Sequence, residues 1–464
     1  MKTPRMVIFL GALAAVITVI FLLGAVLLPR LVDSELIKET ISSRLAKNSA
    51  GSLTLGKIAL LWFPRPTVVI EGVTISFNEK TNGSIRRAKI YPSIFYLLTG
   101  RLVVRRALLE EPKLSIRLPA RSERPLDLAE LEKQIRAMLV RFTTELPAPR
   151  IDLSDGSAEI KIGDQPPALF ENVAAQVAGS PAELRFELSA RSNLCERLRI
   201  EGKISPESLT SQLEIGVRRL KIKESLVLLP LPISEYAQQG EASLDVNIAA
   251  VGLRKLKASI GGSVGPFVFA RHGNTATVEV KKLRGGVAYE GSAFQVDVEQ
   301  LDLGAPRLKA SGMLKIQPGS LSARMNVRDV DIAEVGNLAL RTAGDAEGVK
   351  KAFHYIPAGT IPAMSLQSAG HSIADMTSSR NIVASGMMRN GKIVLPGSDL
   401  GLENVSGEVR ISQGTLEADN VSATHGAMRG WNGVLRLGLD GRSAPFHLDL
   451  LVRSGALDLQ AVLL

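Results

Sequence analysis

Most of this chain alternates between apolar and polar residues with a period of two, and that pattern restricts the fold more than any other feature. From about residue 53 onward, runs such as Leu244-Asp-Val246-Asn-Ile248 place an apolar residue at every second position. Because successive side chains of a strand point to opposite faces, each run predicts a strand with one apolar and one polar face. Gly, Pro and Asn clusters separate the runs at intervals typical of antiparallel hairpins. The sequence therefore predicts a mostly β protein.

Helical periodicity replaces the alternation in two places. Apolar residues between Leu128 and Phe142 lie on one helical face, and Asp127 followed by Glu130 resembles a capping box. A second helical stretch runs over about residues 332–355, and its glycines leave open whether it forms one helix or two short ones.

A motif recurs along the predicted strands. Residues 312–321 match residues 407–416 in spacing and character: glycine, apolar strand, turn, glycine, hydroxyl residue, leucine. A weaker third copy starts at Gly202, and its tail at 217–222 parallels 327–332. The separations are too long and uneven for a short-period solenoid, so they favour a sheet that grows by repeating a hairpin, with coincidental similarity as the alternative.

The start of the chain has the properties of a membrane anchor. Residues 6–28 carry no charge and one polar side chain, Thr18, and they are long enough as a helix to cross a hydrocarbon core of about 30 Å. Lys2 and Arg5 precede this segment and Asp33 follows it, which places the N-terminus in the cytoplasm. A cleavable signal peptide, whose apolar region is normally shorter, is the alternative. The predicted anchor residues are Met6, Val7, Ile8, Phe9, Leu10, Ile17, Ile20, Phe21, Leu22, Leu23, Leu27 and Leu28.

Composition and motifs argue against several classes of chemistry. With one cysteine and five histidines, the chain cannot build cysteine-based zinc sites, iron–sulfur clusters or internal disulfides. No nucleophile elbow, His-Glu-x-x-His helix or Walker loop occurs. We therefore expect no enzyme activity, no catalytic residues, no metal and no cofactor, and a hydrolase is the least favoured hypothesis.

Charged residues often stand next to each other within the predicted strands. The basic doublets Arg86-Arg87 and Lys281-Lys282 lack interleaved aromatic residues, and a net charge of +10 is small for 464 residues, so we expect no nucleic-acid partner. The adjacent acids Glu110 and Glu111 would point to opposite faces of a regular strand, which argues against a catalytic carboxylate pair.

Short motifs follow the anchor in a defined order over about 120 residues. They are Leu-Pro-Arg-Leu-Val-Asp at 28–33, Gly-Ser-Leu-Thr-Leu-Gly-Lys-Ile at 51–58, Trp-Phe-Pro-Arg-Pro at 62–66, Val-Val-Ile-Glu-Gly-Val-Thr-Ile at 68–75, Ile-Phe-Tyr-Leu-Leu-Thr-Gly-Arg-Leu at 94–102 and Leu-Glu-Glu-Pro-Lys-Leu at 109–114. Together with the anchor, they resemble the AsmA family of membrane-anchored periplasmic proteins. Residues 386–452 are similar to repeat units of larger relatives such as YhdP and TamB.

The resemblance implies a bridge-like lipid transfer protein: a long, curved antiparallel sheet that forms an open hydrophobic groove, with a transmembrane helix and a few short helices. It implies a single-pass protein of the bacterial inner membrane, with most of the chain in the periplasm and phospholipid as ligand. The older view of the family makes its members scaffolds or assembly factors for outer-membrane proteins or lipopolysaccharide. The family's usual C-terminal region has no counterpart here, so one expectation is that the chain is the N-terminal portion of a longer member.

The expected organisation has six parts. They are a cytoplasmic tip and anchor (1–30), an AsmA-like N-terminal region with a helix and then strands (31–119), an amphipathic helix and linker (120–150), a β-groove segment (151–330), a helical or irregular insertion (331–380) and a β-groove repeat segment (381–464).

The apolar residues of the alternating strands are the candidate groove-lining residues. Aliphatic side chains on one face would hold acyl chains away from water while headgroups stay hydrated. The alternative for each is an ordinary core residue packed against a second layer. The candidates are Leu244, Val246, Ile248, Val278, Val280, Phe294, Val296, Val298, Leu435, Leu437, Leu439, Phe446, Leu448 and Leu450.

Overall fold

The computed structural model describes most of the chain beyond the predicted anchor. The described residues are 52–61, 65–78, 81–93, 104–118, 128–146, 148–227, 237–271, 274–343, 347–372, 375–376, 378–395, 401–438 and 447–453. The predicted anchor residues, the predicted capping residue Asp127 and the groove candidates Leu439 and Phe446 lie outside these ranges. The helix predicted between Leu128 and Phe142 is present as α4 (Leu128–Glu145). Within them, no helix is both long and apolar enough to cross a membrane.

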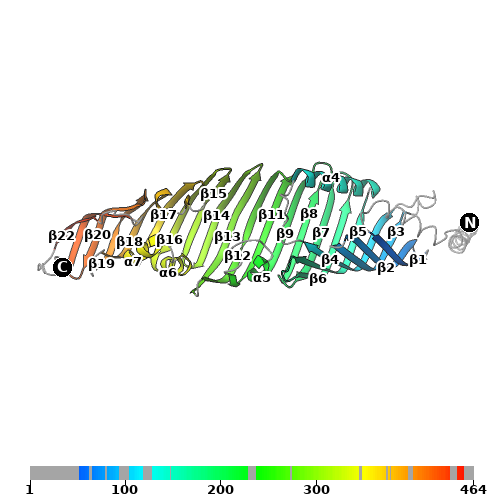
Figure 1. Cartoon of the computed structure of the whole chain (residues 1–464), viewed down its shortest axis with the longest axis horizontal. Helices are drawn as coiled ribbons and strands as arrows, with labels where there is room; N and C mark the ends of the chain where they lie inside the picture. Colours follow the sequence, from blue (N-terminus) through cyan, green and yellow to red (C-terminus); the bar gives the residue numbers. More distant parts are fainter. Residues whose placement is uncertain are drawn as a thin grey trace, which may run out of the picture. The chain divides into compact units, whose positions relative to one another are not determined.

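The predicted β-rich fold is confirmed. The 22 strands belong to one sheet, which is open, since among the described strands β1 pairs only with β2 and β22 only with β21. The chain divides into two compact units, residues 1–210 and 211–464. Figure 1 labels most of the strands and helices described here.

Unit 1 contains eight strands, each paired with the next one along the chain. They are β1 (Ser52–Leu61), β2 (Thr67–Asn78), β3 (Thr81–Pro92), β4 (Val104–Leu118), β5 (Arg150–Ile162), β6 (Ala168–Gly179), β7 (Leu184–Ser192) and β8 (Arg197–Ile204). All pairs are antiparallel except β4–β5, which is parallel. Helix α4 (Leu128–Glu145) lies between these two strands in the sequence, and such a crossover returns the chain to the same end of the sheet.

Unit 2 contains the remaining strands, in which β10 and β11 both pair with β12 and the later strands pair in chain order. They are β9 (Thr210–Lys221), β10 (Ala237–Gln239), β11 (Glu241–Val251), β12 (Lys255–Arg271), β13 (Asn274–Glu290), β14 (Ala293–Ala305), β15 (Leu308–Gln317), β16 (Ser320–Asp331), β17 (Ala358–Gly370), β18 (Ile382–Val394), β19 (Gly401–Ser412), β20 (Thr415–His425), β21 (Met428–Gly438) and β22 (His447–Arg453). β17 lies within the range expected to be helical or irregular.

Short helices interrupt the strands of unit 2. They are α5 (Ile222–Val227), α6 (Ile332–Ala343), α7 (Glu347–Tyr355) and the 3-10 turn η2 (Ser379–Asn381). The stretch over 332–355 is thus two short helices, one of the two predicted alternatives. Asp331 caps α6, because its carboxylate accepts hydrogen bonds from the backbone N–H groups of Ala333 (3.0 Å) and Glu334 (3.1 Å). The six-residue α5 was not predicted.

The sequence repeats correspond to repeated structure. The matching runs at 312–321 and 407–416 each form a hairpin with a two-residue loop. The parallel tails at 217–222 and 327–332 each lead from a strand into a helix, α5 and α6. The first helical residues, Ile222 and Ile332, even contact equivalent glycines, because a Cβ atom added at Gly240 or at Gly359 would lie 3.2 Å from the respective isoleucine.

Candidate functional site

One face of the sheet in unit 2 is apolar from β11 to β21. Cross-strand partners share a face, so the strand register defines rows of side chains across the sheet. One row contains Val246, Ile260, Gly285, Val298, Gly312, Met325, Leu366, Ala384, Ile411, Leu416 and Leu437. The neighbouring row contains Leu244, Gly262, Leu283, Leu301, Ala310, Val327, Met364, Gly386, Val409, Ala418, Leu435 and Leu448. We call this surface the apolar face.

Two pairs of adjacent glycines show that the apolar face is the concave one in β12 and β13. A Cβ atom on Gly262 or Gly285, which lie on the apolar face, would approach a backbone oxygen of the next strand to 2.2 or 2.4 Å. On the opposite face, a Cβ atom on Gly261 or Gly286 would come no closer than 4.0 or 3.3 Å. Side chains converge on the inside of a bend, so the sheet bends toward its apolar face here.

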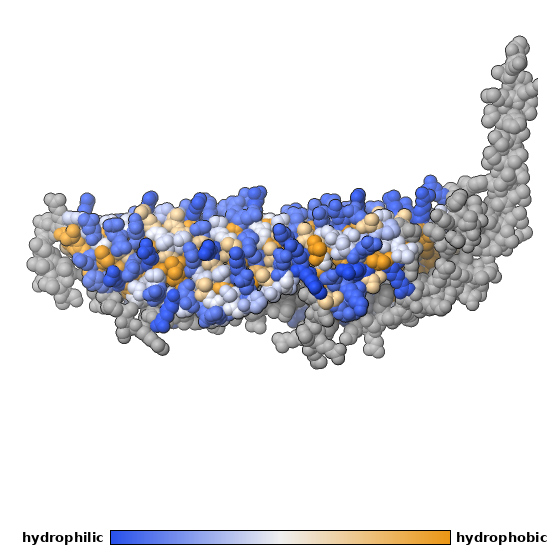
Figure 2. All heavy atoms as spheres, turned by 90° about the horizontal axis from the view of Figure 1, so that it is seen from above, coloured by the Kyte–Doolittle hydropathy of each residue, from blue (hydrophilic) through white to orange (hydrophobic). Residues whose placement is uncertain are grey.

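From β11 to β16 the apolar face is covered only in part. The groove candidates on these strands are half-buried: Leu244, Val246, Ile248, Val278, Val280, Phe294, Val296 and Val298. A sandwich would bury them against a second sheet, whereas the described strands all belong to one sheet. On the side of the molecule shown in Figure 2, hydrophobic residues reach the surface in patches separated by hydrophilic side chains.

From β18 to β21 the same face is closed. Leu435 and Leu437 are 3% and 8% exposed and belong to a buried cluster with Val405 and Val421. Phe353 and Tyr355 of α7 and the following Ile356 pack against this cluster, as do Leu448 and Leu450. These four predicted groove residues therefore lie on the expected face, but in a packed core.

The apolar face of unit 1 follows the same pattern. Val68, Ile70, Val73 and Ala88 form a buried cluster on β2 and β3. Farther along, the rows pass through half-buried residues such as Leu153 and Leu188.

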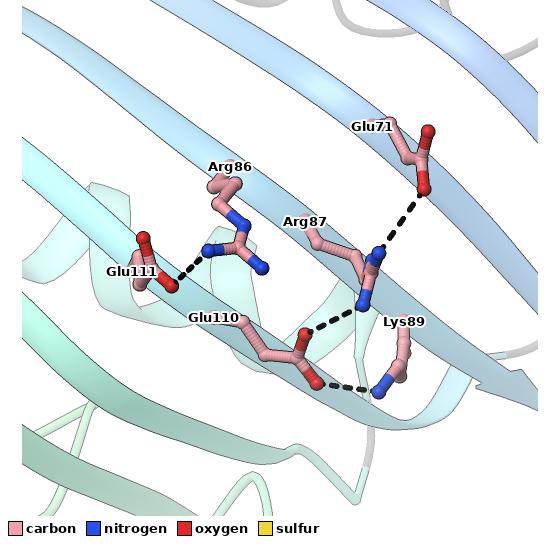
Figure 3. Close-up of polar contacts among 6 residues, drawn as sticks. All are labelled: Glu71, Arg86, Arg87, Lys89, Glu110 and Glu111. Atoms are coloured by element: carbon pink, nitrogen blue, oxygen red, sulfur yellow. Dashed lines mark hydrogen bonds and ion pairs between the residues drawn. The ribbon is translucent and has the colours of Figure 1, made fainter.

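The opposite face of unit 1 is polar and carries ion pairs between neighbouring strands (Figure 3). Arg87 of β3 bridges Glu71 of β2 (3.3 Å) and Glu110 of β4 (3.6 Å), and Lys89 donates a hydrogen bond to Glu110 (2.5 Å). Hydrogen bonding by Lys89 is the main cause that holds the pKa of Glu110 below its ordinary value. These contacts link neighbouring strands on the polar face.

The expectation that Glu110 and Glu111 point to opposite faces is wrong. Glu111 has a φ of 50° and pairs with Arg86, while Glu110 pairs with the adjacent Arg87. Leu109 and Pro112 both lie in apolar rows, so two residues stand between them where a regular strand has one. The positive φ of Glu111 therefore interrupts the alternation and turns both acids to the polar face, while the register with β3 stays continuous.

Nucleophilic and metal-binding groups are sparse in the described part of the chain. No group of three or more His, Cys, Asp or Glu side chains there is placed to hold a metal ion. Cys195 is buried, which raises the pKa of its thiol and disfavours the reactive thiolate. The arrangement that stands out is the one-sided apolar surface.

Comparison with known proteins does not identify a family for this chain. No family model matches the chain, and no curated protein or solved structure matches it either. The AsmA-like assignment therefore stays a prediction from the sequence motifs.

Proposed function

We propose that this protein binds phospholipids along its apolar face and conducts them from the inner membrane toward the outer membrane of a bacterial envelope. The observation that carries the proposal is the unbroken apolar register of unit 2 combined with its half-buried state from β11 to β16. An aliphatic surface that its own fold leaves partly uncovered is suited to acyl chains, since each methylene removed from water contributes about 0.8 kcal/mol.

The same surface accounts for movement along the sheet. Successive strands from β11 to β16 present mainly aliphatic residues on this face, so neighbouring positions of an acyl chain have similar free energies. A ligand bound in this way can be held strongly overall and still slide at little net cost. The anchor predicted at residues 6–28 would hold the conduit at the membrane that supplies the lipid.

Photo-crosslinking tests where the lipid binds. A photoreactive residue at Val246 or Val296 should form phospholipid adducts in cells, because both positions lie on the apolar face and are only half-buried. The matched controls are Asn247 and Asp297, which follow directly in the sequence and lie on the polar face. We expect adducts at the first pair only, detected by mass spectrometry. Equal lipid labelling at both pairs, or none at Val246 and Val296, would contradict the proposal.

A scaffold for envelope proteins is the second candidate. β22 pairs with β21 alone among the described strands, and its Leu451 and Val452 are 58% and 56% exposed. A partner strand could add to such an edge. Protein adducts from a photoreactive residue at Leu451 or Val452, with no lipid adducts at Val246 and Val296, would favour this function over lipid binding.

A further inference from the structure

The polar face of unit 2 contains a hollow of about 360 Å³ that the lipid-binding proposal does not use. It lies over strands β15 to β18 and is bordered at one side by Asn381. Its origin is visible in the register: Ser322 of β16 and Ala369 of β17 are cross-strand partners, and both side chains are small. The longer side chains of Lys315, on β15, and Arg324, on β16, stand beside this floor.

Two basic side chains, Lys315 and Arg324, border the hollow. Some basic side chains elsewhere on the polar face pair with acids of the next strand, as in Arg218–Asp245 (2.7 Å) and Lys309–Asp329 (3.0 Å). Within the described residues, neither Lys315 nor Arg324 forms an ion pair, and no carboxylate lines the hollow. The nearest acid by register is Asp297, opposite Met313, and its oxygens accept hydrogen bonds from Gln295 (2.9 Å).

We propose that this hollow binds the phosphate group of a small organic phosphate. The ammonium group of Lys315 and the guanidinium group of Arg324 supply charge, and a guanidinium can bind two phosphate oxygens at once. The hydroxyl of Ser322 and the amide of Gln367 add neutral hydrogen-bond donors. Four donor groups suit the several oxygens of a phosphate better than the two oxygens of a carboxylate. Met313 and the 49% exposed Val383 provide an apolar wall for the organic part of the ligand. The volume lies at the lower end of the range for small-molecule sites.

Calorimetric titration of the full chain in detergent with sn-glycerol 3-phosphate at low salt tests the site. We expect saturable binding that is weakened about tenfold or more by Arg324→Gln and by Lys315→Gln, because each removes a charged hydrogen bond. Ser322→Phe should abolish binding by filling the floor. Arg284→Gln and Lys257→Gln remove the same charges from the polar face outside the hollow, so they should leave binding unchanged.

The phosphate could belong to a soluble molecule or to a lipid headgroup, and flotation with vesicles separates the two sources. Binding of glycerol 3-phosphate but not glycerol indicates a soluble ligand. Binding only to phosphatidylglycerol vesicles, lost in Arg324→Gln and kept in Arg284→Gln, indicates a headgroup. The site is refuted if neither probe binds, or if the control variants weaken binding as much as the hollow variants. Acyl-chain binding on the other face can fail or succeed independently of this result.

Discussion

At the scale of single residues, adjacent polar residues inside strands have a structural cause. In the described part of the chain, nine non-glycine residues within strands have a positive φ: Glu111, Asp155, Asn172, Arg219, Asp329, Asn390, Asn404, Asn420 and Asn432. Most follow another polar residue, and most lie where the strand register shifts. Where the register shifts, at Asp155, Asn172, Asn390, Asn404, Asn420 and Asn432, the residue belongs to a β-bulge that interrupts the alternation of its strand.

These bulges explain what the alternation alone could not predict. The period of two identified the apolar face, because a buried or half-buried face needs an apolar residue at every second position. Doublets such as Arg86-Arg87 and Glu110-Glu111 break that period, because both residues of each doublet lie on the polar face. An Asn followed by Val or Gly in mid-strand, as at Asn404 and Asn420, is the sequence signal that identifies such a site, since Asn tolerates a positive φ.

Substitution of Asn420 tests the role of the bulge. Asn420 has a φ of 53° and an exposed side chain. Substitution at this position should therefore change the free energy of unfolding mainly through the backbone conformation and little through lost side-chain packing. We expect Asn420→Val to lower the free energy of unfolding by about 1–2 kcal/mol, because a β-branched residue is strained at positive φ, and Asn420→Gly to be nearly neutral. Midpoints of chemical denaturation provide the measurement, with Asn247→Val at an ordinary strand position as control. Equal midpoints for Asn420→Val and Asn420→Gly would show that the bulge is not required.

At the scale of elements, α7 divides the apolar face of unit 2 into an uncovered part and a closed part. The sequence placed Leu244 and Leu437 on the same kind of strand, and the register puts both on the apolar face. Alternation cannot show which of them a distant helix covers. Phe353 of α7 packs against the cluster that contains Leu437, which is 8% exposed, whereas Leu244 is half-buried.

Thiol labelling can detect this division. Cys195 is the sole cysteine of the sequence, so Cys195→Ser gives a background for Leu244→Cys and Leu437→Cys. We expect rapid labelling at position 244 and slow labelling at position 437. Phe353→Ala should accelerate labelling at 437 only, and lower the free energy of unfolding by about 2–3 kcal/mol, because it removes a large, half-buried side chain. Equal rates at both positions in the unsubstituted background would contradict a cover formed by α7.

At the scale of the whole molecule, the sequence predicted the class of the fold and not its details. A mostly β chain with repeated hairpins followed from the alternation and from the matched runs at 312–321 and 407–416. The parallel pairing of β4 with β5 could not be predicted in this way, because the apolar–polar alternation of a strand is the same whether its neighbour runs parallel or antiparallel. The functional proposal depends on a difference between the two faces of the sheet. One face carries mainly apolar residues, and the other carries ion pairs.

Transfer of fluorescent phospholipid between donor and acceptor vesicles by the full-length protein tests that proposal most directly. Val296→Asp places a charge on the uncovered apolar face, and Gln295→Asp places the same charge on the polar face one residue away. We predict that Val296→Asp abolishes transfer and retains the circular-dichroism spectrum and the denaturation midpoint of the parent protein, and that Gln295→Asp transfers lipid normally. Normal transfer by a folded Val296→Asp variant, or loss of transfer only through unfolding, would contradict a lipid path on the apolar face.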